Sequence, residues 1–518
     1  MELLADNQIH SFINAGFIKI ELPELELFHK QIDVRLREVC EAEPNLGNNF
    51  LPRMPILQRV LRHEKVEGAL TSLLGPDYLV HPHRAIHRST PLREPLQGFS
   101  SSSNEHLMGD GSTATSLWHQ DAQSPLAKAR YHFPRFLLGF YFPHDVDSLM
   151  GPTRFLKASY CDNGPDLDRQ IYQPERIQAG TLFLAHFDIA HAGFPNASEI
   201  DRFMLKFVFA RTTCPSTPSW NNESSELPFV EAETSRDLLY RPAAHFIWKK
   251  LLGHTNVELV QEEQAVQDSG ECRTSDQRLR SIYDARRGPS TQHCLESLRS
   301  IKDKFKHERV QKNLRDLTTG YPVRWNERAI VMEAAAYRLA ALGAQSSDVV
   351  FTLLESDEPW LQINGAFVAG EIGKENAALS SHLANLLLSS HHQVVRQAID
   401  ALSYTKTESD VGILQRLNHL ILEDRSTWQS AQVTRGWSAA DQIHMNIAMY
   451  LLAKCNHYEH HKLIETAYLI LQKAGDYAAS IVTEALIRSG SRHAQELALS
   501  YLKDRAWNTS LLGSVRAY

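Results

Sequence analysis

The sequence has few cysteines, and no two of them stand close together. The six are Cys40, Cys161, Cys214, Cys272, Cys294 and Cys455. This scatter indicates neither a thiolate zinc site nor a disulfide framework. A chain of this kind suits a reducing compartment, so we expect a cytoplasmic protein.

Basic excess and long apolar runs are also missing. The formal net charge is −7, whereas a dedicated nucleic-acid surface needs an excess of Lys and Arg. No run approaches the roughly 18 apolar residues of a membrane span. The first residues carry acids where a signal peptide carries basic residues. We therefore expect neither nucleic acid nor a membrane among the partners.

The length of 518 residues exceeds what one hydrophobic core holds together, so we expect more than one unit. Strand signals dominate until about residue 240 and then stop. Residues 255–320 are rich in Glu, Gln, Asp, Arg and Lys, which is typical of helices with polar faces. The predicted division is a barrel domain over 1–245, a polar helical linker over 246–325 and an all-helical domain over 326–518.

The first half combines short strands with turns that contain Gly or Pro. Gly16 is expected to end a short helix, and an amphipathic helix should follow over 22–43. The predicted strands cover 17–20, 79–86, 136–142, 153–156, 181–185 and 203–211. The run 136–142 is apolar throughout, which predicts burial on both faces. The set suggests a jelly roll or a similar double-sheet barrel, whose mouth is a usual place for a ligand.

Residues 89–116 differ from these strands because they are polar and rich in Gly and Ser. The stretch is too long for a simple connection. It is either a disordered surface loop or a lid that leads into Trp118, since long loops beside active sites often close over them. Both interpretations remain open.

A different regularity governs the last third of the chain. Helix-like stretches with small residues on one side recur at a spacing of about 30 residues. They cover 328–343, 361–373, 394–404 and, in more diverged form, 443–453 and 478–490. Such stretches predict an α-solenoid, in which each helix pair buries its face on the next. The pattern resembles HEAT-type repeats, and the alternative is an ordinary helical bundle.

The segment Trp118–Asp121 is the strongest functional signal. On a strand, His119 and Asp121 project from one face, and His191 downstream could complete a set of two His and one carboxylate. That set leaves open positions on an octahedral ion and suits non-haem Fe(II) and O₂ chemistry. Arg202 follows His191 and could hold the distal carboxylate of 2-oxoglutarate with its bidentate fork.

The chain has 25 histidines, so competing ligands were considered. His81 and His83 also alternate, but they lack a carboxylate in register, and Pro82 weakens a central-strand interpretation. His186 competes with His191 and stands opposite to it in strand phase. We favour His191, because only it has the following Asn and Arg at the spacing of the family named next.

Ordered motifs over roughly residues 7–212 resemble the phytanoyl-CoA dioxygenase family of Fe(II)/2-oxoglutarate oxygenases. The motifs are Phe12–Phe17, Leu74–Asp77, Trp118–Asp121, Gly151-Pro152, Ala179–Leu182, His191–Ser198 and Asp201-Arg202. The resemblance implies a double-stranded β-helix fold. It also implies that His119, Asp121 and His191 ligate iron and that Arg202 pairs with 2-oxoglutarate.

The resemblance also bears on the reaction. Related halogenases have a small residue where this chain has Asp121, so hydroxylation, desaturation or ring formation is expected instead. Gly193 stands where a hydroxyl often assists the co-substrate, which leaves the second polar contact unassigned. We expect an α+β protein, a barrel followed by a HEAT-like solenoid, that uses Fe(II), 2-oxoglutarate and O₂ to oxidise an unactivated C–H of a small organic or carrier-bound substrate.

Two other functions remain open. The repeats could grip a protein substrate across their concave face, which would make the chain a macromolecule-modifying oxygenase with a protein partner. Alternatively, the chain could be a non-catalytic scaffold with a degenerate barrel.

Overall fold

A computed structural model describes most of the chain. The described residues are 1–43, 50–92, 118–121, 129–162, 169–228, 235–260, 274–300, 332–373, 376–405, 411–423, 432–433, 437–456 and 459–504. The lid expected at 89–116 lies almost wholly outside them and stays a prediction. No helix in the described ranges combines the length and the apolar character that crossing a membrane requires.

Among the described elements, helices and strands are mixed up to β9 (Arg202–Ala210), and helices predominate after it. The strands are β1 (Phe17–Glu21), β2 (Leu79–Ser89), β3 (His119–Gln120), β4 (Phe136–Phe142), β5 (Arg154–Leu156), β6 (Ile171–Tyr172), β7 (Thr181–His186), β8 (Ala190–Ala192), β9 (Arg202–Ala210), β10 (Gln432–Val433) and β11 (Trp437–Ser438). The earlier helices are α1 (Asp6–Ala15), α2 (Glu26–Ala42), α3 (Phe50–Arg53), α4 (Gln58–Leu61), α5 (Glu64–Leu74), α6 (Ser235–Leu251), α7 (Thr274–Tyr283) and α8 (Thr291–Ser300). The later helices are α9 (Ala334–Leu342), α10 (Ser347–Leu354), α11 (Pro359–Ile372), α12 (Ala377–Leu386), α13 (His392–Tyr404), α14 (Val411–Leu422), α16 (Ala439–Lys454), α17 (His460–Lys473), α18 (Asp476–Arg488) and α19 (Arg492–Asp504).

Two antiparallel sheets form the first half. The larger has the strand order β1-β7-β4-β9-β2, and the smaller has the order β3-β8-β5-β6. Phe155 of the smaller sheet lies 4.8 Å from Phe17 and 5.3 Å from Phe140 of the larger, measured between ring centroids. The two sheets therefore face each other, and we call the facing surfaces the inner face. Strand β4 is buried at every position, which confirms the expectation for 136–142.

Helices cover the outer face of the larger sheet. The ring of Phe50 on α3 packs edge-on against Phe207 of β9, 5.6 Å between centroids, and His29 Nδ1 on α2 lies 2.7 Å from the Tyr141 hydroxyl. Helix α1 ends at Gly16, as the sequence predicts: with φ +83° it donates its N–H to Phe12 O. A left-handed residue at this position suits glycine because glycine has no Cβ to clash.

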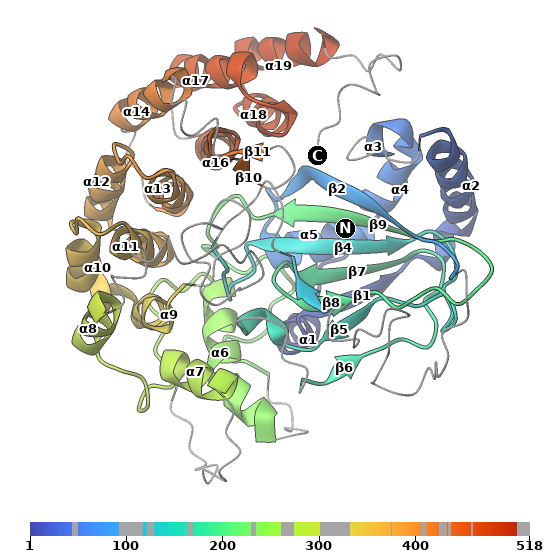
Figure 1. Ribbon diagram of the computed structural model, residues 1–518, viewed down its shortest axis with the longest axis horizontal. Helices are drawn as coiled ribbons and strands as arrows, with labels where there is room; N and C mark the ends of the chain where they lie inside the picture. The colour runs from blue at the N-terminus through green and yellow to red at the C-terminus, as the bar shows by residue number, and fades with distance from the viewer. Residues whose placement is uncertain are drawn as a thin grey trace.

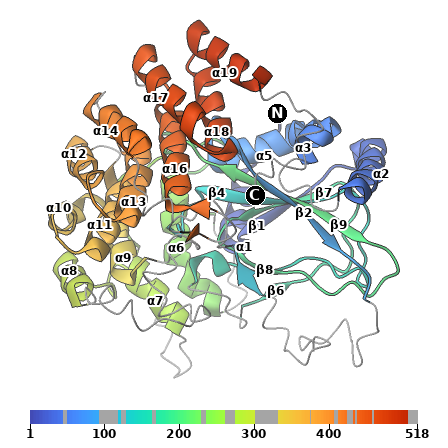
Figure 2. The same cartoon turned by 45° about the horizontal axis from the view of Figure 1, so that its top comes forward.

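The later helices form an arc around the sheets, which we call the helical arc (α9–α19; Figure 1). An inner row of α9, α11, α13, α16 and α18 stacks in order, and α10, α12, α14, α17 and α19 form an outer row (Figure 2). The five recurring stretches of the sequence coincide with the five inner helices. Small and apolar residues recur there because each inner helix packs against the next.

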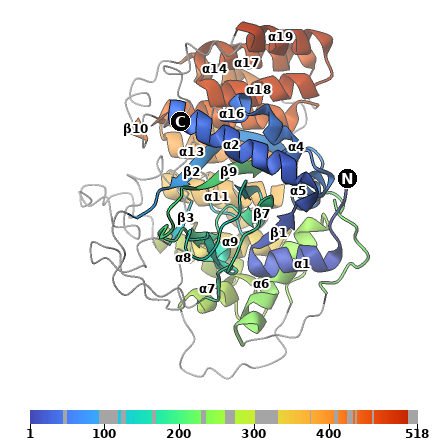
Figure 3. The same ribbon diagram turned by 90° about the vertical axis from the view of Figure 1, so that its right-hand side faces the viewer.

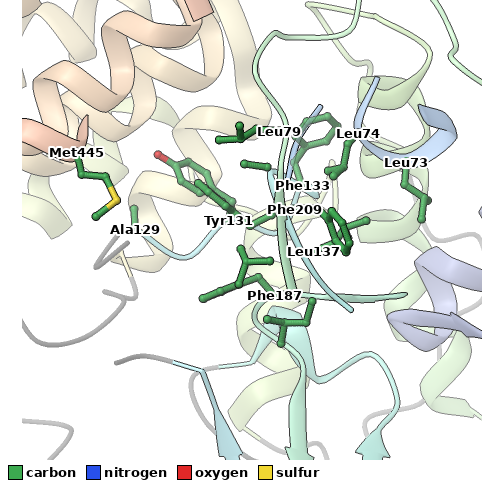
Figure 4. Close-up of a cluster of buried hydrophobic side chains, with 14 of the residues drawn as sticks. Leu73, Leu74, Leu79, Ala129, Tyr131, Phe133, Leu137, Phe187, Phe209 and Met445 are labelled. Carbon is green, nitrogen blue, oxygen red and sulfur yellow. The ribbon is translucent and has the colours of Figure 1, made fainter. Parts of the chain in front are cut away.

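The inner row does not enclose an empty surface, because the sheets lie against it (Figure 3). Tyr131, just before β4, donates a hydrogen bond to Asp400 of α13, and Arg488 of α18 donates to Tyr78 O at 3.0 Å. Figure 4 shows Tyr131 between Met445 of α16 and apolar side chains of the sheet. Buried apolar residues form one continuous cluster across both halves, and α6 runs through the predicted boundary at residue 245. The three-part division of the chain stays a prediction.

Candidate metal centre

Two histidines face each other on neighbouring strands of the smaller sheet. His119 on β3 is the register partner of His191 on β8. Residues directly opposite each other in an antiparallel pair project from the same face, and the ring centroids are 4.4 Å apart. Phe155 is the partner of His191 on the other side and lies on the inner face. Both imidazoles therefore point into the space between the sheets.

Hydrogen bonding and burial prepare His191 to act as a ligand. Its Nδ1 lies 3.1 Å from Ile189 O and donates to that carbonyl, so the lone pair is left on Nε2. Burial, with the nearby charge of Lys206, lowers the pKa of His191 to about 3. The ring is thus neutral at physiological pH, which is the form that binds a metal.

Asp121 follows β3 directly and completes the group. Its Oδ1 lies 3.8 Å from His119 Nε2 and 3.9 Å from His191 Nε2. One ligand atom from each residue lies within 4.8 Å of the other two, and no other group of this kind exists in the part of the chain that the structure describes. Ligand atoms on one face of an octahedral ion are about 3 Å apart, so small side-chain rotations would close the set around one ion.

A residue that sequence reasoning missed completes the surroundings of Asp121. Lys206 Nζ forms an ion pair with Asp121 Oδ2 and lies 5.4 Å from the centroid of the Phe140 ring. Burial alone would raise the pKa of Asp121, but Lys206 and the two imidazoles outweigh it, so this pKa lies well below its ordinary range. The strand alternation that puts Lys206 on the same face as Arg202 could have revealed it.

Arg202 begins β9. It lies on the inner face, on the same side of the strand as Met204, which follows two residues later. Arg202 is 6% exposed, and its Nε and Nη1 have no hydrogen-bond partner among the residues that the structure describes. Burial lowers the pKa of the guanidinium to about 10, which still leaves it charged at neutral pH. A buried cation with unsatisfied N–H groups is costly unless an anion pairs with it. Arg202 is thus suited to bind a carboxylate, and His87, the register partner of Met204, lines the same face.

The rival histidines are not members of this cluster. His81 is buried, accepts a hydrogen bond from His83 N at 3.0 Å and stacks on Tyr477 of α18. His83 also contacts Tyr477, with 3.3 Å between Nδ1 and the hydroxyl oxygen. His186 stacks on Tyr160 at 4.3 Å between centroids and accepts from Asp188 N at 3.1 Å. These rings are held by packing and hydrogen bonds, as structural histidines are.

Comparison with known proteins gives partial structural likenesses only. No family model and no curated protein matches the chain. Apo HygX from Streptomyces hygroscopicus aligns with 44% of this chain and 95% of its own, at 12% identity and a TM-score of 0.30. The carbocyclase SnoK of nogalamycin biosynthesis, a non-haem α-ketoglutarate-dependent enzyme, aligns with 40% of this chain and 85% of its own, at 15% identity and a TM-score of 0.30. The non-haem monooxygenase ThoJ aligns with 47% and 97%, at 16% identity and a TM-score of 0.27.

Other HygX structures hold iron, or nickel with 2-oxoglutarate. Two imidazoles and one carboxylate on a shared face are the donor set of a 2-His-1-carboxylate centre, and this donor set fits a divalent iron ion.

Proposed function

We propose that the protein is an Fe(II)- and 2-oxoglutarate-dependent oxygenase of small organic or carrier-bound substrates. One observation carries the proposal: the cluster of His119, Asp121 and His191 shares the inner face with Arg202, a buried guanidinium whose Nε and Nη1 have no partner in the described part of the chain. A three-ligand metal site and a carboxylate site on one surface are what binding of a metal-chelating keto acid requires.

In this function the three ligands hold the iron and Arg202 receives the distal carboxylate of 2-oxoglutarate. Iron with the keto acid and O₂ supplies the oxidising chemistry, in which 2-oxoglutarate becomes succinate and CO₂ and a substrate C–H is oxidised. The protein's own residues orient the ligands and shield the site from water. Ile189 O fixes the tautomer of His191, and the rings of Phe140 and Phe155 beside it exclude water from the reacting side.

The fold proposed with this function is a double-stranded β-helix of the phytanoyl-CoA dioxygenase type, followed by HEAT-like repeats. The two facing antiparallel sheets and the two-row helical arc support it. The presence of Asp121 favours hydroxylation, desaturation or cyclisation, because a third protein ligand takes the position that a halide would need.

Succinate formation tests the proposal without a known substrate. Purified protein with Fe(II), 2-oxoglutarate and O₂ should release succinate slowly, and under anaerobic conditions the same mixture should show a weak visible charge-transfer band. Asp121→Ala should abolish both, whereas Asp348→Ala, which removes an exposed carboxylate on α10, should retain both. The absence of succinate from wild-type protein, or its persistence in Asp121→Ala, would contradict the proposal. Succinate would also eliminate the non-catalytic scaffold.

The macromolecule-modifying alternative meets a structural obstacle. The inner row of the helical arc contacts the protein's own sheets through Tyr131, Arg135 and Tyr78, so a gripped partner would have to use another surface. Incubation with the metabolite fraction and, separately, the protein fraction of a cell extract, with and without 2-oxoglutarate, would distinguish the two by mass spectrometry. A product that depends on 2-oxoglutarate in the protein fraction alone would favour the alternative.

A further inference from the structure

Lys206 is a buried cation whose placement the metal site alone does not explain. It lies in the middle of β9, is 9% exposed and is the register partner of Phe140. Burying an ammonium is costly unless a carboxylate or several hydrogen bonds compensate. Among the described residues, the one ion pair that the structure gives Lys206 is with Asp121. A lysine held at this point must act on that carboxylate.

The two oxygens of Asp121 have separate partners. Oδ1 faces both imidazoles, at 3.8 and 3.9 Å from their Nε2 atoms, whereas Oδ2 contacts Lys206 Nζ. The carboxylate is thus oriented with one oxygen toward the metal position, and its other oxygen is held in the ion pair with Lys206. Carboxylates otherwise bind metals through one oxygen or through both.

We propose that Lys206 is a positioning residue that limits Asp121 to a single metal–oxygen bond. The proposal rests on the proposed function, because it concerns the same metal site. An octahedral ion with three protein ligands keeps three open positions, and a chelating keto acid together with O₂ needs all three. If Asp121 bound through both oxygens, one of those positions would be lost. Lys206 keeps it open.

The charge of Lys206 should weaken metal binding, and this effect on metal affinity can be measured. A fixed positive charge close to a divalent cation repels it and weakens binding, and this repulsion is strong in a poorly solvated site. Apart from Asp121, the described neighbours of Lys206 bring no negative charge to it: Phe140 presents its ring, and His83, His87 and His191 are imidazoles. The structure therefore trades metal affinity for an open coordination position.

Removing the charge should move two affinities in opposite directions. In Lys206→Met and Lys206→Gln, titration calorimetry with Co(II) should show binding about tenfold tighter or more, because the repulsion is gone and both oxygens are free. The Co(II)-loaded variants should bind 2-oxoglutarate about tenfold more weakly, since one open position is filled. Lys19→Met is the matched control. Lys19 lies on the same inner face of the larger sheet and pairs with Glu21, so its loss should change neither affinity.

A merely structural lysine would not produce this opposed pair of shifts, because a disturbed site loses both affinities together. Unchanged affinities in both variants, or a parallel loss of both, would overturn the proposal for Lys206 while leaving the oxygenase proposal intact. Failure of the wild-type protein to bind Co(II) would instead contradict the metal site. The Gln variant keeps a polar group near Asp121 without the charge, so it preserves the test if the Met variant does not fold.

Discussion

His119 and His191 lie directly opposite each other on β3 and β8, with 4.4 Å between their ring centroids. Because both rings supply a ligand atom to one cluster, His119→Ala or His191→Ala should lower Co(II) or Fe(II) affinity by about 100-fold or more. His186→Gln is the matched control, since this ring stacks on Tyr160 and is not part of the cluster. Metal affinity is measured by calorimetry. A loss of metal affinity in His186→Gln with none in His191→Ala would reverse the choice between the two histidines.

Arg202 should matter for the co-substrate and not for the metal. Arg202→Met removes the buried guanidinium that is placed to meet a carboxylate, so 2-oxoglutarate affinity of the metal-loaded protein should fall about 100-fold, with Co(II) affinity unchanged. Arg154→Met offers a close control. Arg154 is another buried arginine with unpartnered nitrogens, but it lies beside Ala192 on the opposite face of the smaller sheet, 3.7 Å over the Phe194 ring. If Arg154→Met lost 2-oxoglutarate binding and Arg202→Met did not, the carboxylate site would have to be assigned to Arg154 instead of Arg202.

A buried ion pair ties the sheets to the helical arc. Arg135 Nη2 lies 2.5 Å from Glu371 Oε1 of α11, and the guanidinium lies between the rings of Tyr131 and Tyr404. Arg135→Met should lower the free energy of unfolding by about 3–5 kcal/mol, because it leaves a buried carboxylate uncompensated. The double variant with Glu371→Gln should recover part of the loss. Denaturant titration measures both.

An exposed ion pair serves as the control for the stability change in Arg135→Met. Lys30→Met breaks the contact with Glu26 on α2, where both side chains are well exposed. The change in the free energy of unfolding should be small, because an exposed ion pair contributes little to stability. If Arg135→Met were no more destabilising than Lys30→Met, the contact between the sheets and the helical arc would not be formed as described.

Lys454 should give the stability of the protein a distinct pH dependence. Burial lowers the pKa of this lysine from 10.5 to about 8 in the folded protein, and its Nζ donates to Thr405 O at 2.6 Å. Below pH 8 both states carry the proton and the burial penalty is fully present. Between pH 8 and 10.5 the unfolded chain retains the proton that the folded protein releases, so stability rises with pH.

The comparison with Lys454→Met isolates this effect. Between pH 7 and pH 9.5 the wild-type protein should gain about 2 kcal/mol relative to the variant, from the shift of roughly 1.5 pH units above the folded pKa. Urea denaturation at the two pH values provides the measurement. A constant difference between the two proteins would mean that the amine is solvated.

Local patterns predicted much of the fold because local forces decide those features. Gly16 ends α1, the apolar run 136–142 is a doubly buried strand, and the recurring stretches are the inner helices. Periodicity shows which side of an element is apolar, but it does not show what covers that side. Periodicity therefore could not predict that the sheets pack against the inner surface of the helical arc. On α2, Leu27 and Val34 belong to the apolar pattern yet are exposed, since neither faces the sheet.

The candidate site was predicted to a similar degree. His119 and Asp121 were predicted from strand phase, and His191 was preferred to His186 on the resemblance to the phytanoyl-CoA dioxygenase family; the structure brings the three together. Strand alternation places Lys206 on the same face as Arg202, but the ion pair of Lys206 with Asp121 depends on strand order, which no local pattern encodes. The contact of His83 with Tyr477 on α18 was out of reach for the same reason.

The contact between Arg488 and Tyr78 has a consequence for how the protein is made. A ribosome delivers β2 long before α18, so the surface that receives the helical arc stays uncovered through most of translation. Domains usually fold as they emerge, but here the final burial of Arg135 and His81 waits for the C-terminal third of the chain. A chain that ends early within the arc therefore leaves exposed to solvent a cation and an apolar surface that the complete protein buries. Such a chain is prone to aggregation or proteolysis.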